Sequence, residues 1–140
     1  MNRTAFRTDP ATVLLFGTGG EGRERAEWRD GQRTGEVITR DGATVRRLSG
    51  VAVSVGGLGL DGAVVETTTP IDEVPAGAVF RASGVCEVSV RAEAQAGIGK
   101  DAPPRASLSI TVFIERLEPV GSVADLVNGK AAPARRGGGE

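Results

Sequence analysis

Hydrophobic and polar residues alternate with a period of two through much of the chain between Ala43 and Pro119. Such alternation places every second side chain on one face of a β-strand, and no stretch shows the period of about 3.6 residues typical of an amphipathic helix. Glycine, proline and aspartate interrupt the pattern at short intervals and mark turns. The pattern predicts strands over residues 11–16, 36–40, 43–55, 63–69, 78–90 and 106–117.

The strongest local prediction is a hairpin that turns at Asp41 and Gly42. These two residue types accept the positive φ angles that a tight two-residue hairpin turn requires. We expect the second arm of the hairpin to continue to Val55, with a bulge or a sharp bend at Gly50. Gly84 is expected to kink a later strand in the same way.

A chain of 140 residues is long enough for one domain of ordinary core size. Its β segments fit an all-β fold, a small five-stranded Greek-key barrel of the OB type, because closing the sheet removes exposed strand edges. An open β-sandwich remains the alternative. We expect a flexible tail over residues 1–10, the barrel domain over 11–127 and a disordered tail over 128–140. Ser122 is expected to cap a short helical turn at the end of the domain.

The composition argues against an enzyme. The chain has no histidine, no tyrosine and one cysteine, so the usual residues for acid–base, nucleophilic or metal chemistry are nearly absent. We therefore expect no catalytic residue, no metal and no cofactor. Cys86 is interpreted as a small hydrophobic core residue rather than a reactive thiol. Because one cysteine forms no intramolecular disulfide and no apolar run approaches the roughly 20 residues of a membrane span, a soluble cytoplasmic protein is expected.

Two glycine-rich segments invite comparison with phosphate-binding loops. Residues 17–22 follow a predicted strand, but they have neither the spacing of a dinucleotide fingerprint nor a following helix. Residues 97–101 lack the full P-loop spacing and the Ser or Thr that follows the P-loop lysine. Neither segment predicts a nucleotide site.

The formal net charge of −1 gives the molecule no strong overall field for attracting polyanions, so any affinity for nucleic acid must come from a local patch. Most of the 17 basic residues are arginine, whose planar group suits phosphate recognition and base stacking better than lysine does. A codon bias toward GC-rich triplets is the other explanation, and the abundance of alanine, glycine and valine beside arginine favours it.

Five segments carry a resemblance to a known group of proteins: TGEVITRDG (34–42), GVAVSVG (50–56), AVVETTTP (63–70), VPAGAVFRA (74–82) and SLSITVFIERLEP (107–119). In the order of its strands and turns, the chain resembles small OB-type proteins encoded on actinobacterial plasmids and integrative elements. It is also similar in layout to the single-stranded DNA-binding proteins of filamentous phages. The resemblance implies a homodimer or higher oligomer that binds single-stranded DNA during replication or transfer of a mobile element.

A single-stranded DNA-binding surface needs arginines for the phosphates and planar groups on which bases stack. The candidates are Arg40, Arg46, Arg47, Arg81, Arg91, Lys100, Arg105, Trp28 and Phe113. For each of them, a solvated surface charge or a core aromatic is the alternative interpretation. Trp28 either closes one end of the barrel or forms an exposed stacking platform.

A structural or assembly protein is the rival functional class, such as a phage or cell-envelope β-sandwich subunit that makes only protein contacts. Low aromatic content, a mildly acidic isoelectric point and the expected flexible ends favour this rival.

Overall fold

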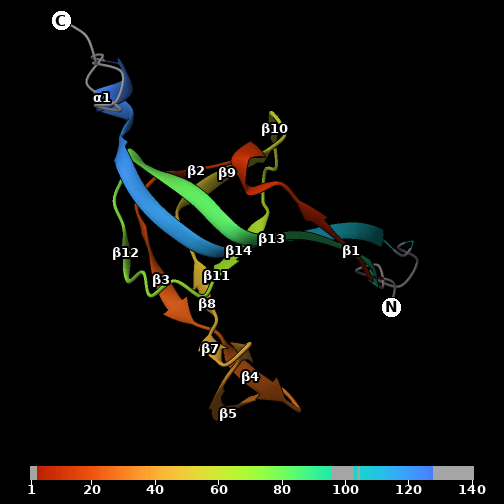
Figure 1. Ribbon diagram of the computed structural model, residues 1–140. Coiled ribbons are helices and arrows are strands. Elements are labelled where there is room, and N and C mark those ends of the chain that lie inside the picture. Colours follow the sequence, from red (N-terminus) through yellow and green to blue (C-terminus); the bar gives the residue numbers. More distant parts are fainter. Residues whose placement is uncertain (1–2, 96–102, 104, 128–140) are drawn as a thin grey trace, which may run out of the picture.

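The computed structural model describes residues 3–95, 103 and 105–127, and these residues form a sheet-rich fold (Figure 1). Ten strands belong to one sheet. In chain order they are β1 (Arg3–Thr8), β2 (Val13–Gly17), β3 (Gly20–Glu24), β8 (Arg46–Leu48), β9 (Val51–Val55), β10 (Leu58–Gly59), β11 (Val64–Thr67), β12 (Glu73–Val74), β13 (Ala78–Gln95) and β14 (Arg105–Ser122). The all-β class expected from the sequence is confirmed.

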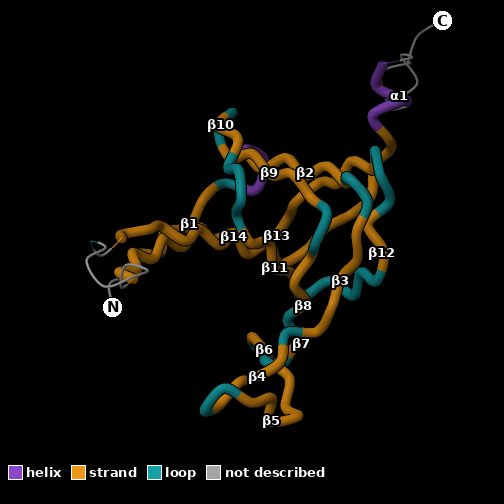
Figure 2. The backbone as a smooth tube through the Cα atoms, turned by 180° about the vertical axis from the view of Figure 1, so that it is seen from behind, coloured by secondary structure: helices purple, strands orange, loops and turns teal. Residues whose placement is uncertain are grey.

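Two hairpins and two short helical segments complete the described part of the chain. They are β4 (Ala26–Arg29) with β5 (Gln32–Val37), β6 (Thr39–Arg40) with β7 (Ala43–Thr44), the 3-10 turn η1 (Pro10–Thr12) and helix α1 (Val123–Val127). The β4–β5 hairpin projects from one end of the sheet, and α1 lies at the other end (Figure 2). The described residues include no helix with the length and apolar character that crossing a membrane demands.

The strand order in the large sheet is β10-β9-β2-β13-β14-β11-β8-β3-β12, with β1 paired to β13 off this path. All neighbours are antiparallel except β11 and β14, which run parallel. The path ends at β10 and β12, and no pairing between described residues joins these ends. The predicted five-stranded Greek-key barrel is therefore not confirmed, because the strands are more numerous and the sheet is open.

The long pair β13–β14 organises the sheet. Each of the two strands has 18 residues, and their register shifts between Ser83 and Cys86, where Gly84 has a φ of 78°. This bulge is the predicted kink, and it bends the pair. The first part of β13 pairs with β2 and the second part with β1. The bend thus divides β13 between a curled body and an extended arm that ends near the N-terminus (Figure 1).

The core lies on the concave side of the curled sheet, where alternate strand residues meet. Leu15, Val65, Val112 and Ile114 are completely inaccessible to solvent. Cys86 is buried among them, as expected of a small hydrophobic residue, and burial raises the pKa of its thiol. The other buried members of the cluster are Val13, Leu48, Val53, Val74, Phe80, Ala82, Val88 and Leu117.

Several local predictions are confirmed. Asp41 and Gly42 have φ angles of 51° and 83° and join β6 to β7 in a two-residue turn. Ser122 caps α1, since its hydroxyl accepts a hydrogen bond from the backbone nitrogen of Asp125. Both features depend on residues close in sequence, which the local pattern specifies.

Other predictions differ from the structure. Residues Arg3–Thr8, expected in a flexible tail, form β1 and pair with β13 over their whole length. Residues 17–35, in which the alternation predicts no strand, contain β3, β4 and most of β5. The chain turns at Gly50 as expected, with a φ of 67°, but the hairpin arm does not continue as one strand to Val55, because β8 and β9 pair with different strands. The tail expected over 128–140 lies outside the described residues.

Candidate functional site

The face of the sheet opposite the core carries rows of polar side chains that cross the strands. Directly opposed residues in neighbouring strands project on the same side of a sheet. The longest row runs from β1 to β3 through Arg7, Glu87, Phe113, Glu66, Arg47 and Arg23. The next rows contain Ala5, Ser89, Thr111 and Val64, and then Arg3, Arg91 and Ser109. We call the surface over these three rows the arginine face.

The alternation of β13 explains why the arginine face is polar. Ser89 and Arg91 project toward this face, whereas Val88 and Val90 belong to or pack against the core. The facing strand β14 follows the same rule, since Thr111 lies opposite Ser89. On the arm, β13 and β14 therefore turn apolar residues to one side and serine, threonine or arginine residues to the other.

Part of the arginine face is hollowed into an inner pocket of about 200 Å³. Strands β1, β8, β11, β13 and β14 contribute to its lining, which consists of Arg3, Arg25, Arg47, Val64, Glu66, Ser89, Arg91, Ser109 and Thr111. Four arginines and one glutamate thus line the same pocket, although the formal net charge of the whole chain is −1. The pocket is a local concentration of positive charge, which is the feature that a nearly neutral binder of polyanions requires.

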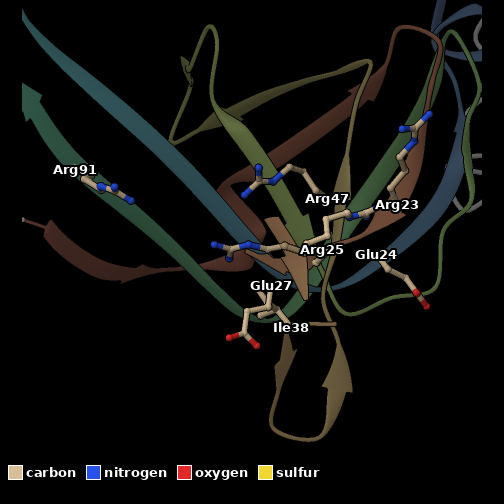
Figure 3. Close-up of a pocket in the computed structure, with 9 residues that line it drawn as sticks. Arg23, Glu24, Arg25, Glu27, Ile38, Arg47 and Arg91 are labelled. Atoms are coloured by element: carbon tan, nitrogen blue, oxygen red, sulfur yellow. The ribbon is translucent and has the colours of Figure 1, made fainter. Parts of the chain in front are cut away.

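A larger outer groove of about 690 Å³ adjoins the inner pocket, and Arg25, Arg47 and Arg91 line both. The rest of its lining consists of Arg23, Glu24, Ala26, Glu27, Arg33 and Ile38. In Figure 3 the side chains of Arg25 and Arg47 extend toward the side on which Arg91 lies, and Arg23 extends away from it. The two hollows together form a continuous track whose described lining includes six arginines and three glutamates.

Glu66 lies at the base of this track. Glu66 is 5% exposed, and its carboxylate accepts hydrogen bonds from Nη1 of Arg25 at 3.3 Å and from Nη2 of Arg47 at 2.9 Å. A buried carboxylate is costly unless cations and hydrogen bonds compensate for its lost hydration, and the two guanidinium groups provide both. The side chains of Arg25 and Arg47 remain 40% and 50% exposed, so part of each guanidinium group faces solvent.

The backbone around Arg25 is fixed although the residue lies between two strands. Its nitrogen donates to the carbonyl oxygen of Val45, and its own carbonyl oxygen accepts from the nitrogen of Ile38. On the other side of the inner pocket, Nη2 of Arg3 donates to the hydroxyl oxygen of Ser89 at 3.0 Å. The side chains of Arg3, Arg25 and Arg47 are thus each oriented by a hydrogen bond to a neighbouring side chain.

Of the nine residues expected to bind nucleic acid, Arg47 and Arg91 line both hollows of the arginine face. Arg40 lies on the same side of the sheet but has another role. Its guanidinium carbon is 3.9 Å from the centre of the Phe113 ring, and its Nη2 is 3.4 Å from Oε1 of Glu87. Phe113 is 5% exposed, so in this structure its ring is a buried aromatic covered by Arg40 rather than an open stacking platform.

The structure does not bring the remaining predicted residues to the arginine face. Arg46 projects from the side of β8 opposite to Arg47, and its Nη1 donates a hydrogen bond to Oδ1 of Asp72. Arg81 borders a separate, mainly apolar hollow beside β2. Lys100 lies outside the described residues, as do the side chains of Arg105 and Trp28.

Sequence reasoning missed Arg3, Arg25 and Glu66. Arg3 was assigned to a flexible tail, although the alternating residues 3–8 carry a weak strand signal. Glu66 is the single acidic residue in a β-branched strand, which is a signal that could have marked it. Nothing local in the sequence indicates that these residues meet.

Comparison of the chain with family models, with characterised proteins and with solved structures finds no match. Within the described residues, no group of three or more histidine, cysteine, aspartate or glutamate side chains is placed to hold a metal ion.

Proposed function

We propose that this protein binds single-stranded DNA, with the phosphates of the strand along the arginine face. The observation that carries the proposal is the convergence of Arg3, Arg25, Arg47 and Arg91, from distant parts of the chain, on one continuous track. Guanidinium groups bind phosphate oxygens through paired hydrogen bonds, and their planes also accept stacked bases. A track of this kind follows a flexible backbone without requiring a particular base sequence.

The resemblance to OB-type proteins of mobile elements supports the same proposal. It extends the proposal to an oligomeric, cytoplasmic protein that serves replication or transfer of such an element. An OB-type barrel is likewise part of the proposal. The described strands curl around a core, but the two ends of the strand path do not pair with each other.

A structural or assembly role is the second candidate function, and one feature favours it. Phe6 and Leu108 are 50% and 70% exposed, and both lie on the apolar side of the arm that β1, β13 and β14 form. Large apolar side chains exposed on one side of a sheet are a feature of protein contact surfaces. Under this reading the arm associates with other protein subunits, and the arginine face makes no contact with nucleic acid.

A titration of fluorescein-labelled oligothymidine of about 16 nucleotides, followed by anisotropy, tests the first proposal. A strand that places about four phosphates along the two hollows predicts that log K falls with log salt with a slope of about −2.8. Raising salt from about 50 mM to about 200 mM should therefore weaken binding about 50-fold. Absence of binding at the lower salt would reject the DNA proposal, and concentration-dependent assembly without DNA would then support the structural one.

A further inference from the structure

We propose that the inner pocket holds one phosphate group, and that Glu66 is the positioning residue that orients Arg25 and Arg47 toward it. The identity of the molecule that carries the phosphate rests on the proposed function, whereas the phosphate site itself rests on the geometry of the pocket. An acidic residue at the base of a polyanion-binding surface needs an explanation, because its charge repels the ligand.

The position of Glu66 is set by strand pairing on both sides. It lies opposite Phe113 of β14 and opposite Arg47 of β8, so its carboxylate is held in the longest row of the arginine face. Its Oε2 atom is 3.2 Å from Nη1 of Arg25 and 2.9 Å from Nη2 of Arg47. One carboxylate oxygen therefore brings two guanidinium groups to a common point.

A guanidinium group has five N–H donors, and the contacts to Glu66 use only part of them. The exposed parts of Arg25 and Arg47 keep donors for an anion, and the hydroxyl groups of Ser109 and Thr111 line the same pocket. Because Glu66 already holds the two side chains, a ligand has to order less of them on binding. The arrangement fits a small anion with acceptor oxygens on several sides, which describes a phosphate group.

The size of the pocket limits what enters it. Its volume of about 200 Å³ is below the range of about 300 to 1,000 Å³ that is typical of sites for whole drug-sized molecules. One phosphate group fits this volume better than a nucleotide does. The rest of the strand would then follow the outer groove, which shares Arg25, Arg47 and Arg91 with the pocket.

The variant Glu66→Gln separates a positioning role from a mere charge effect, because the two predict opposite signs. Removing a negative charge strengthens attraction to a polyanion in general. If Glu66 orients the arginines, oligothymidine binding should instead weaken, by about fivefold at about 0.1 M salt, which is the contribution of one phosphate contact. Glu118→Gln, at an exposed position of β14, makes the same charge change and should leave affinity unchanged or slightly increase it. Tighter binding by both variants would overturn the proposal.

Arg47→Lys provides a second test that keeps a positive charge beside the buried Glu66, at a side chain that is itself half exposed. Lysine keeps the charge but lacks the planar fork that bonds Glu66 and a phosphate together. We expect weaker oligothymidine binding with the same salt slope as the original protein. Unchanged affinity would contradict the role assigned to the fork.

Inorganic phosphate distinguishes failure of the pocket from failure of the DNA proposal. At matched ionic strength, phosphate should raise the melting temperature of the original protein relative to chloride, and it should do so less for Arg47→Lys. If oligothymidine does not bind but phosphate gives this result, the pocket stands and the DNA proposal fails. If neither binds, both fail. Oligothymidine with and without a 5′-phosphate then shows whether a terminal or an internal phosphate occupies the pocket.

Discussion

Arg46 and Arg47 offer a matched pair of substitutions for testing the arginine face. They are adjacent in β8 and carry the same charge, but strand alternation sends them to opposite sides of the sheet. Arg47 lines both hollows and bonds Glu66, whereas Arg46 bonds Asp72. Replacing each by alanine changes the net charge equally, so a difference between the two variants reports position rather than charge.

The expected magnitude follows from counterion release. Each phosphate contact on a single strand contributes about 0.7 to the salt slope, so Arg47→Ala should change the slope from about −2.8 to about −2.1. The same relation makes one contact worth about fivefold in affinity at about 0.1 M salt relative to 1 M. Arg46→Ala should leave the slope unchanged and alter affinity less than twofold, roughly the effect of a distant screened charge.

The assay is the anisotropy titration of oligothymidine at four or more salt concentrations for each variant. Thermal unfolding checks that both remain folded. The Arg46–Asp72 pair is expected to contribute at most about 1 kcal/mol to stability, because the Asp72 side chain is 82% exposed. Equal slopes for the two variants would refute the assignment of the phosphates to the arginine face.

Three further predictions concern the fold. Gly22→Ala should lower the free energy of unfolding by more than about 2 kcal/mol, since a Cβ atom there would approach the carbonyl oxygen of Ile71 to 1.9 Å, whereas Gly59→Ala in open space should change it by less than about 0.5 kcal/mol. Urea denaturation measures both, and similar losses would contradict the packing argument. The buried thiol of Cys86 should react with a thiol reagent only as fast as the protein opens, and fast labelling of the native protein would count against its burial. Because burial raises the pKa of this thiol in the folded state, the unfolded chain loses the proton first as pH rises, so stability should decline above the ordinary value of 9.0.

The parts of the fold that depend on neighbouring residues could be predicted from the sequence. Asp41 and Gly42 specify the hairpin turn because both tolerate positive φ. The kink at Gly84 and the burial of Cys86 follow from glycine geometry and from alternation. In each case the physical cause lies within a few residues of the feature.

Pairing between distant strands could not be predicted in this way. Residues Arg3–Thr8 look like a polar tail until β13 is beside them, because the hydrogen bonds that make them a strand come from residues 86–91. The open path of strands has the same origin. The chain turns at Gly50, between β8 and β9. The strands with which β8 and β9 pair are set by the rest of the sheet and not by this turn.

The arginine face was only half predicted for a related reason. Residue type selected Arg46 and Arg47 together, and only the strand register distinguishes them. That register is fixed by the core, since Leu48 is 5% exposed and pairs with the buried Val65. A slip of one residue between β8 and β11 would turn Leu48 to the polar side, at a cost of roughly 1.5 to 3 kcal/mol for exposing a leucine. The hydrophobic residue thereby determines which arginine reaches Glu66, and burial of the core and assembly of the positive track are consequences of the same pairing.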